Sequence, residues 1–534
     1  MNVPLTPIRF LRYAEQQFPN KTAIVCRNQR FAYSQFADRA SRLAGALKSI
    51  GVQSGDRAAF LSINCHRLLE AYFGVLEAGA VLLPLNVRLA PSEIAFILRD
   101  ATPTVLFLER IFLPLVELFR AEVGVEKFIL MDDHPAATWL MPQSYEELIA
   151  STTPYRCDLM ELNENAVAEI FYTSGTSANP KGVMLSHRNI YLHALNGCLT
   201  FDPTREHVHL HTIPLFHANG WGYAHAITFI GGKHVMIQRW DCGELFRLIE
   251  QERVTGMALV PTIAIALVNS PERSKYDLSS LERVTIGGAA SSPSLIKEVE
   301  ENLGCTCYAG YGLTETSPTL SVAFTKAGCD WQGEERYRGQ AMTGYAIPGS
   351  ELRVVDAYGN DVAHDGHAVG EIIARGDGVM MGYWNQPQAT AEVLRDGWLH
   401  TGDLATIDEN GYLLIVDRKK DIIISGGENI SSLEVEKALS AHPDVYEVAV
   451  ISVPDEKWGE TPKALVVLKP GARATEQQLL EFCASRLARF KCPRSVEFLP
   501  ALPKTGTGKI LKRELREKYW GQATIRPELV TRSS

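Results

Sequence analysis

Several features are missing from this 534-residue chain, and each absence removes a class of protein. No apolar run approaches the ~20 residues of a membrane-spanning helix, and no secretory leader opens the chain. The ten cysteines form no Cys-x-x-Cys pair and no His/Cys cluster with zinc spacing, so we expect reduced thiols. These absences predict a cytoplasmic protein that contacts a membrane at its periphery at most.

Basic residues are fewer than acidic ones. The chain has 53 Lys and Arg against 62 Asp and Glu, a formal net charge of -9. A nucleic-acid-binding surface is basic, so no nucleic-acid partner is expected. Hydrophobic residues make up 46% and charged residues 22%, as in a soluble globular protein. The length is too great for one core and predicts two to four packed units.

A loop rich in small and hydroxylic residues, 171–183, stands out first. It follows the apolar run 167–172, which predicts a buried strand, and it precedes a helical pattern that opens at Ser186. A Gly/Ser/Thr loop with a lysine after a strand is typical of a backbone cradle for phosphate groups. From these residues alone, an ordinary hydroxyl-rich surface loop is an equal alternative.

The segment before this loop alternates helical patterns with short apolar runs. Residues 32–50 predict an amphipathic helix that ends at Gly51, and residues 57–62 and 80–85 predict strands joined by a helix at 65–77. This alternation is typical of parallel β-α-β units. No Gly-x-Gly-x-x-Gly fingerprint follows these strands, so dinucleotide binding is not expected.

Alternating histidines follow the loop, at His207, His209 and His211. A strand would place all three on one face without a carboxylate beside them, which favours a polar strand face over a metal site. His217 and Trp221 lie in a glycine-containing turn beyond the strand end. Ligands collect at such strand ends in open α/β sheets.

Two further strand-to-loop segments end in small residues that allow a flat ligand to approach the backbone. They cover residues 284–290 and 305–316, and the second adds a tyrosine and a glutamate. Following a phosphate-type loop, they favour a nucleotide site. From about residue 351 the chain is β-rich, and the charged stretch 417–421 predicts a domain boundary. Helices at 433–441 and 476–490 and strands at 447–453 and 464–468 then predict a small α+β unit.

These motifs together resemble the adenylate-forming superfamily of acyl-CoA synthetases, firefly luciferase and non-ribosomal adenylation domains, over nearly the whole chain. The motifs stand in family order: Tyr172-Thr173-Ser174-Gly175-Thr176 with Pro180-Lys181-Gly182, Tyr311-Gly312-Leu313-Thr314-Glu315, Thr401-Gly402-Asp403, Asp417-Arg418-Lys419-Lys420-Asp421 and Gly506-Thr507-Gly508-Lys509. The resemblance is to fatty acid–CoA ligases in particular.

The resemblance implies an α/β fold with two domains. Residues 1–419 would form a large domain of layered sheets and helices with a distorted β-barrel portion, holding the acid and ATP sites. Residues 420–534 would form a small mobile α+β domain with its hinge at Lys420. It also implies the reaction: ATP and a carboxylic acid give an acyl-adenylate and pyrophosphate, and coenzyme A then displaces AMP. A carboxylate is a poor electrophile, so the enzyme must neutralise phosphate charge, align the reactants and exclude water.

The resemblance also assigns residues. Catalysis would depend on Lys509, Glu315, Thr173 and His217, and Mg²⁺ would bind at Glu315 and Thr173. ATP would be bound by Thr173, Ser174, Gly175, Thr176, Ser177, Lys181, Gly288, Ala289, Ala290, Tyr311, Gly312, Thr314, Asp403, Arg418, Lys420 and Lys509. The acid would be bound by His217, Trp221, Gly288 and Gly310, and coenzyme A by Gly426 and Gly427. In one departure from the family, Ser177-Ala178 stands where Thr-Gly is usual.

The acid itself is less constrained. In fatty acyl-CoA ligases a tryptophan at the position of Trp221 gates the acyl tunnel, and the aspartate of amino-acid-activating domains is missing here. Some long-chain ligases have Lys and Trp where this chain has Ile424 and Asn429. We expect medium- to long-chain fatty acids, with aryl or short substituted acids as the alternative. A carrier-protein loader or a non-catalytic relative is a third hypothesis, although the latter should lack Lys509 or Glu315. A homodimer is left open.

Overall fold

The computed structural model describes residues 2–132, 138–173, 180–419, 421–426, 428–455, 457–504 and 509–520. The chain divides into two compact units, Met1–Leu352 with Ile373–His400 and Arg353–Ile372 with Thr401–Ser534. The architecture is mixed α/β with a large and a smaller unit, which confirms the predicted fold class. The expected boundary between residues 419 and 420 stays a prediction, and Lys420 lies outside the described residues.

The first unit contains two large sheets. One has the strand order β15-β14-β13-β12-β11-β9-β10-β1-β2, and the other β18-β8-β7-β4-β3-β5-β6. The strands of the first are β1 Thr22–Cys26, β2 Gln29–Ala32, β9 Val208–His211, β10 Lys233–Met236, β11 Gly256–Leu259, β12 Arg283–Ile286, β13 Thr306–Gly312, β14 Thr319–Val322 and β15 Tyr345–Ala346. Those of the second are β3 Arg57–Leu61, β4 Val81–Pro84, β5 Val105–Leu108, β6 Lys127–Leu130, β7 Val167–Thr173, β8 Lys181–Ser186 and β18 Gly382–Tyr383.

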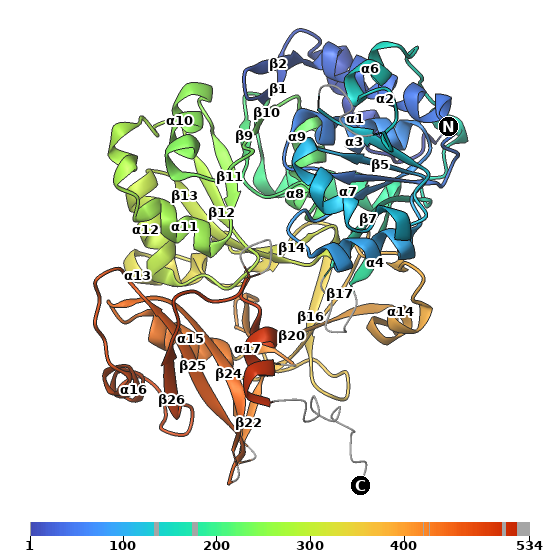
Figure 1. Cartoon of the computed structure of the whole chain (residues 1–534). Helices are drawn as coiled ribbons and strands as arrows, with labels where there is room; N and C mark the ends of the chain where they lie inside the picture. Colours follow the sequence, from blue (N-terminus) through green and yellow to red (C-terminus); the bar gives the residue numbers. More distant parts are fainter. Residues whose placement is uncertain are drawn as a thin grey trace. The chain divides into compact units, whose positions relative to one another are not determined.

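Helices cover these sheets. In Figure 1, α10, α11 and α12 lie along one side of strands β11 to β13. The helices of this unit are α1 Ile8–Gln17, α2 Tyr33–Ser49, α3 His66–Glu77, α4 Pro91–Ala101, α5 Leu113–Glu117, α6 Tyr145–Ala150, α7 His187–Phe201, α8 Ala218–Trp221, α9 Tyr223–Ile230, α10 Cys242–Glu252, α11 Pro261–Val268, α12 Pro293–Leu303, α13 Gly333–Gln340 and α14 Pro387–Val393.

The predicted parallel β-α-β units are confirmed. Strand β3 pairs in parallel with β4 and β5, and β5 pairs in parallel with β6. Helix α2 ends at Ser49, two residues before the predicted stop signal Gly51, which has φ 89°. Fully buried aromatic rings fill the space between strands and helices, such as Phe60 stacked on Phe107 at 4.5 Å between centroids. Burial of each such ring contributes ~2 kcal/mol of hydrophobic free energy.

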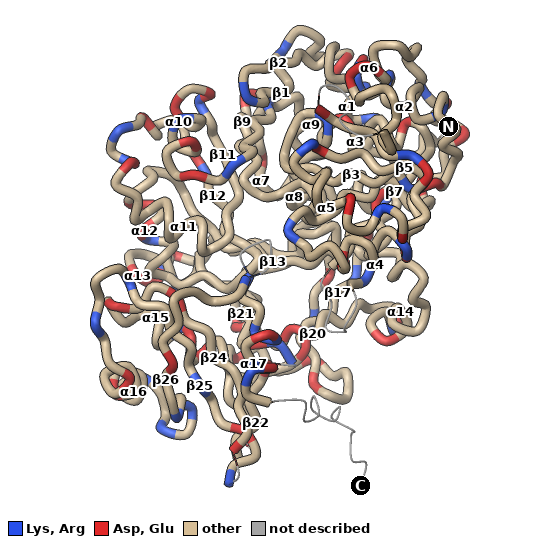
Figure 2. Tube along the Cα trace, viewed as in Figure 1, with Lys and Arg blue, Asp and Glu red and all other residues tan. Residues whose placement is uncertain are grey.

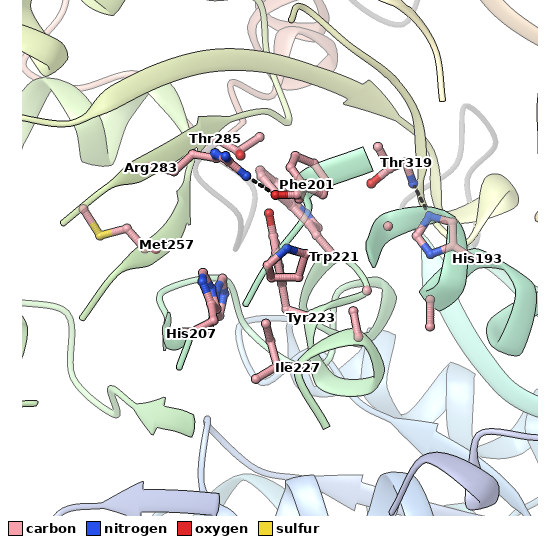
Figure 3. A pocket seen from close by; sticks show the side chains of 17 residues that line it. His193, Phe201, His207, Trp221, Tyr223, Ile227, Met257, Arg283, Thr285 and Thr319 are labelled. Carbon is pink, nitrogen blue, oxygen red and sulfur yellow. Dashed lines mark hydrogen bonds between the residues drawn. The ribbon is translucent and has the colours of Figure 1, made fainter. Parts of the chain in front are cut away.

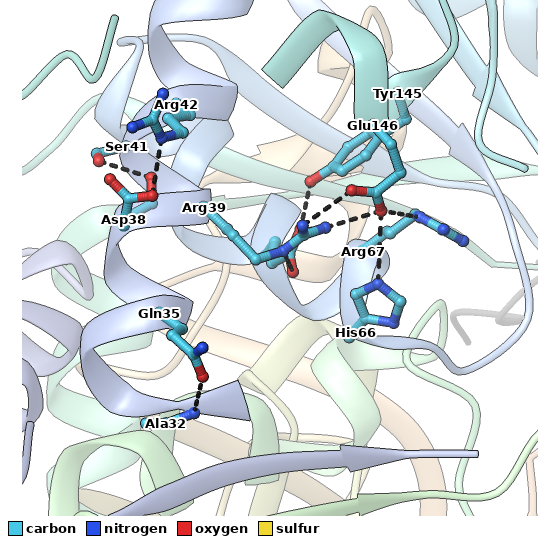
Figure 4. Close-up of polar contacts among 11 residues, drawn as sticks. Ala32, Gln35, Asp38, Arg39, Ser41, Arg42, His66, Arg67, Tyr145 and Glu146 are labelled. Atoms are coloured by element: carbon cyan, nitrogen blue, oxygen red, sulfur yellow. Dashed lines mark hydrogen bonds and ion pairs between the residues drawn. The ribbon is translucent and has the colours of Figure 1, made fainter. Parts of the chain in front are cut away.

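A buried polar network joins α2, α3 and α6 (Figure 4). Arg39 Nε donates to Glu70 Oε1 at 2.6 Å, and its Nη1 donates to Glu146 Oε2 at 2.8 Å. Tyr145 donates its hydroxyl to Glu70 at 2.6 Å, and Arg67 donates to Glu146 at 2.7 Å. Because Glu70 is fully buried, these donors are what make its charge tolerable in the interior.

The chain passes from one unit to the other within β16, β17 and β20. These strands belong to a sheet with the order β16-β17-β20-β19, in which β21 pairs with β20. The strands are β16 Ser350–Val355, β17 Gly370–Gly376, β19 Leu394–Arg395, β20 Trp398–Ile407 and β21 Leu413–Arg418.

The rest of the second unit is a small α+β body, as predicted. Its sheet has the order β23-β22-β25-β24, with β26 pairing β25. Its elements are β22 Ile423–Ser425, β23 Glu428–Ile430, α15 Ser432–Ser440, β24 Val445–Asp455, β25 Gly459–Leu468, α16 Glu476–Ala484, β26 Ser495–Phe498 and α17 Lys512–Trp520. Helix α16 is shorter than the predicted 476–490, because the residues after Ala484 turn and bring Leu487 and Cys492 against the core of this unit.

Charged residues of both signs are interspersed along the elements of each unit, as Figure 2 shows. Within the described part of the chain, no helix is long and apolar enough to cross a membrane.

Candidate functional site

The loop expected to hold phosphate lies between two paired strands. Thr173 ends β7 and pairs with Lys181, the first residue of the antiparallel strand β8. The two residues therefore flank the connection between the strands at the same level. Four of the predicted ATP-binding residues, Ser174, Gly175, Thr176 and Ser177, lie outside the described residues.

Glu315 is joined to Lys181 through a residue that the sequence did not reveal, Tyr383. The Tyr383 hydroxyl donates to Glu315 Oε1 at 2.9 Å, and Lys181 Nζ lies 5.0 Å from the centroid of the Tyr383 ring. Strand pairing explains the placement, because Tyr383 on β18 lies opposite Val183 on β8. Burial and the nearby Glu315 charge raise the pKa of the Tyr383 phenol, so it remains a hydrogen-bond donor.

This arrangement fits a magnesium ion that arrives with a phosphate chain. Tyr383 occupies one carboxylate oxygen of Glu315, and Oε2 makes no hydrogen bond within the described residues. Mg²⁺ is usually held by one or two carboxylates together with substrate phosphates. Thr173 lies at the end of the hairpin that carries Lys181.

The predicted nucleotide residues follow two adjacent parallel strands, β12 and β13. Gly288, Ala289 and Ala290 begin two residues after the end of β12, and Gly288 has φ 81°, a conformation that favours glycine. Tyr311 and Gly312 end β13, and Thr314 and Glu315 form the 3-10 turn that follows. Both groups therefore stand at the carboxyl edge of the sheet, where ligands bind in open α/β folds.

The predicted acid-binding segment has an unusual backbone. Ala218, Asn219, Gly220 and Trp221 have φ values of 40°, 46°, 61° and 60°, and Gly222 follows at 88°. Left-handed conformations cost roughly 1–2 kcal/mol for each non-glycine residue and tend to occur at functional sites. His217 immediately precedes this segment, and its backbone carbonyl accepts from Gly220 N at 3.0 Å.

Trp221 lies directly against the backbone that follows β12. A β-carbon added at Gly287 would come within 3.1 Å of the Trp221 ring and 3.1 Å of Gly310 O. The indole of Trp221 therefore leaves little room for a side chain at position 287. The structure therefore brings together Trp221 and the end of β13, where Gly310 lies.

A buried carboxylate that the sequence did not reveal holds this segment. Glu169 is fully buried on β7; its Oε2 accepts from Asn219 Nδ2 at 3.1 Å and its Oε1 lies 2.7 Å from His225 Nε2. The strand that leads to Thr173 is in this way tied to the turn that carries Trp221. The pattern gave no signal, because Glu169 stands within an apolar run.

A cavity of about 590 Å³, its open mouth included, lies beside Trp221 (Figure 3). Strands β9, β11 and β12 line one side, and helices α7 and α9 line the other. Its wall is largely apolar, with polar groups that include His193, His207, Arg283 and Thr319. His193 Nε2 accepts from Thr319 N at 3.0 Å, and burial lowers the pKa of His193 to about 4.

Two of the three alternating histidines, His207 and His211, make side-chain hydrogen bonds, and His207 Nδ1 lies 3.0 Å from Thr255 Oγ1. His211 Nε2 lies 2.9 Å from His234 Nδ1, and His234 Nε2 lies 3.0 Å from Thr228 Oγ1. Burial lowers the pKa of His211 to about 3, which keeps this chain of rings neutral. Among the described residues, no group of three or more His, Cys, Asp and Glu is arranged to hold a metal ion.

The remaining predicted residues belong to the second unit. Asp403 on β20 pairs with Arg418 on β21, and Arg418 Nε lies 3.1 Å from Asp403 Oδ1. Lys504 and Ile510 form an antiparallel bridge, which places Lys509 next to it. Gly426 has φ 60°, and a β-carbon there would lie 2.4 Å from the Trp458 ring. Lys420 and Gly427 lie outside the described residues.

Family comparison covers both parts of the chain. Residues 11–384 match the family described as AMP-binding enzyme, and residues 434–509 match the AMP-binding enzyme C-terminal domain.

Curated relatives and solved structures are similar along almost the whole length. The chain is 38% identical to 4-hydroxybutyrate–CoA ligase 2 of Metallosphaera sedula, covering 97% of this chain and 95% of the relative. It is 41% identical to a long-chain-fatty-acid–CoA ligase of Thermus thermophilus, with coverages of 92% and 90%. The crystal structure of the anthranilate CoA ligase AuaEII in complex with anthranoyl-AMP has a TM-score of 0.89 at 27% identity, covering 97% of this chain and 98% of that one.

Proposed function

The chain belongs to the AMP-binding enzyme family and is an acyl- or aryl-CoA ligase, and we propose that its acids are medium- to long-chain fatty acids. The observation that carries this proposal is the largely apolar cavity of about 590 Å³ beside Trp221. Small-molecule sites are lined mostly by hydrophobic and aromatic side chains, as this cavity is. Apolar walls favour an alkyl chain, because each buried CH₂ contributes ~0.8 kcal/mol.

Aryl or short substituted acids are the second candidate. The similarity to an anthranilate CoA ligase over 97% of the chain supports it. A flat ring could also stack on the indole of Trp221.

ATP and coenzyme A are the co-substrates of such ligases. In the proposed reaction a carboxylate oxygen of the acid attacks the α-phosphorus, and the bond to pyrophosphate breaks. The thiolate of coenzyme A then attacks the acyl carbon and releases AMP. A thiolate displaces AMP readily because the mixed anhydride is a far better electrophile than the free acid.

The described residues suit defined roles in this reaction. Lys181 and the residues around Thr173 would neutralise the phosphate chain. Glu315, positioned by Tyr383, would bind Mg²⁺, which supplies further charge neutralisation on the phosphates. These proposed roles are supported by the contacts of Tyr383, whose hydroxyl donates to Glu315 and whose ring lies beneath Lys181 Nζ.

Other roles are proposed for the remaining predicted residues. Tyr311, with Gly288, Ala289 and Ala290 beside it, would receive the adenine. His217 and Trp221 would border the acid. In the second unit, Asp403 and Arg418 would bind the ribose hydroxyls, and Gly426 would contact coenzyme A.

Lys509 is proposed as the residue that stabilises negative charge in the adenylation transition state. We further propose that residues 420–534 move about Lys420 between the two half-reactions. Lys420→Pro should then spare pyrophosphate release and impair thioester formation. A normal overall rate for this variant would contradict the hinge.

The proposed function is tested with a panel of acids from acetate to palmitate, together with benzoate and cinnamate. CoA-dependent AMP release should be greatest for an acid of medium or long chain. Greatest turnover of benzoate or cinnamate would favour the aryl candidate, and no release with any acid would refute the function. The cytoplasmic location stays a prediction.

A further inference from the structure

The cavity beside Trp221 extends along the strands of the sheet instead of ending at the indole. In Figure 3, His193 and Thr319 lie on one side of Trp221, and His207 and Arg283 lie on the other. Thr319 pairs with Gly312 at the carboxyl end of β13, whereas Arg283 is the first residue of β12. The cavity therefore reaches from the edge with the candidate nucleotide residues towards the opposite edge of the sheet.

Strand geometry gives the scale of this cavity. Arg283 and Gly287, which Trp221 covers, are four residues apart along one extended segment, a distance of ~13 Å. With C–C bonds of ~1.5 Å, an extended alkyl chain of about ten carbons spans this distance. An acid with its carboxylate beyond Trp221 and a chain of medium length would place its far end near Arg283.

The far end of the cavity holds a positive charge. Arg283 Nη1 donates to the Phe201 carbonyl, and the guanidinium carbon lies 5.8 Å from the centroid of the Phe324 ring. No carboxylate forms an ion pair with Arg283 in the described part of the chain. A guanidinium has five N–H donors, so several remain for a ligand. Because Arg283 is half-buried beside an apolar ring, a hydrogen bond from its guanidinium to a ligand oxygen would be stabilising.

A second polar group lines the same region independently. His209 is 2% exposed, stacks on Tyr223 at 4.0 Å between centroids, and borders the cavity. Its Nδ1 has no hydrogen-bond partner among the residues that the structure describes. Buried polar atoms usually have partners, so an unsatisfied one at a cavity wall indicates a missing ligand group.

We propose that this cavity selects carboxylic acids of medium chain length whose far end carries an oxygen acceptor, bound by Arg283 and His209. The proposal rests on the proposed acid–CoA ligase function and names its substrate class more narrowly. An unsubstituted methyl end would offer no acceptor to the remaining Arg283 N–H groups and no partner to His209 Nδ1. A site built to hydrogen-bond a substrate oxygen discriminates strongly against the analogue that lacks it. Either a hydroxyl or a carboxylate supplies this chemistry.

The test compares octanoate, ω-hydroxyoctanoate and octanedioate in CoA-dependent AMP release by the full chain. The expected result is a kcat/KM at least tenfold higher for one of the two oxygen-bearing acids than for octanoate. Preference for octanedioate would identify a carboxylate as the recognised end, and preference for ω-hydroxyoctanoate a hydroxyl. Octanoate used as well as both would overturn the proposal.

Variants connect this preference to Arg283. Arg283→Met should reduce the ratio of kcat/KM between the preferred acid and octanoate at least tenfold, and Arg283→Lys should retain part of it. Arg273→Met is the matched control, because Arg273 also donates to a backbone carbonyl, that of Asn302, without lining the cavity. A general loss of folding would lower both rates and leave the ratio unchanged.

The outcomes separate this proposal from the function on which it rests. Activity with octanoate and an unchanged ratio in Arg283→Met would refute the selectivity and leave the ligase function intact. No AMP release with any acid of the wider panel would refute the ligase function itself.

Discussion

The hydroxyl of Tyr383 donates to Glu315 Oε1 at 2.9 Å across 68 residues of sequence. Lys181 Nζ lies 5.0 Å from the centroid of the same tyrosine ring. Tyr383 thus connects the carboxylate expected to hold Mg²⁺ with the lysine expected to contact phosphate. Its position depends on the pairing of β18 with β8, which local sequence does not encode.

Tyr383→Phe should lower kcat/KM for ATP about tenfold. The variant loses a hydrogen bond to a charged group, which is worth ~1.5–3 kcal/mol, and frees Glu315 to rotate. Steady-state kinetics of pyrophosphate release, with ATP varied at saturating acid, measure the effect. Tyr358→Phe is the control, because Tyr358 is 91% exposed. Equal kinetics for the two variants would show that Tyr383 does not position Glu315.

Glu169→Ala should lower the free energy of unfolding by ~3 kcal/mol. The substitution leaves Asn219 and His225 in the interior without their shared acceptor, and removing one member of a buried pair typically costs this much. Urea unfolding followed by circular dichroism measures it. Glu206→Ala is a control on an exposed side chain, for which a change near zero is expected. A loss below about 1 kcal/mol for Glu169→Ala would contradict the account.

His193 predicts a dependence of stability on pH. Burial lowers the pKa of His193 to about 4 from an ordinary value of 6.5. Between these values the unfolded state binds a proton that the folded state does not, so the free energy of unfolding falls as the pH falls through this window. In His193→Gln the amide oxygen can accept from Thr319 N without titrating. The slope of the free energy of unfolding against pH should therefore be smaller in this variant. An unchanged slope between pH 6.5 and 4 would contradict the assignment.

Lys509→Ala should separate the two half-reactions. We expect loss of acyl-adenylate formation by roughly a hundredfold or more, as for removal of a group that stabilises transition-state charge. Conversion of supplied acyl-adenylate to the thioester should continue. Single-turnover assays of each half-reaction measure this, and equal loss in both would exclude the role.

Local signals in the sequence predicted the fold well. The strand and helix periods around residues 57–85 predict β3, α3 and β4, which pair and pack as expected. The glycine at position 51 marked the end of α2 because it takes φ 89°. These features depend on short-range sequence and on the hydrophobic period, so a single chain is enough to find them.

Contacts between distant segments were not predictable. Tyr383, Glu169 and Arg283 each acquire a role from strand pairing or from a helix packed across the sheet. Glu169 stands in an apolar run, and nothing in that run indicates why a carboxylate is present. The reason becomes visible only when Asn219 and His225 lie beside it.

Trapping the acyl-adenylate is the decisive measurement of whether this chain activates an acid as its adenylate. The protein is incubated with ATP, Mg²⁺ and octanoate or ω-hydroxyoctanoate without coenzyme A, and bound products are identified by mass spectrometry. We expect acyl-AMP and pyrophosphate, followed by acyl-CoA and AMP when coenzyme A is added. Formation of ADP, or thioester formation without acyl-AMP, would show that the acid is not activated as its adenylate.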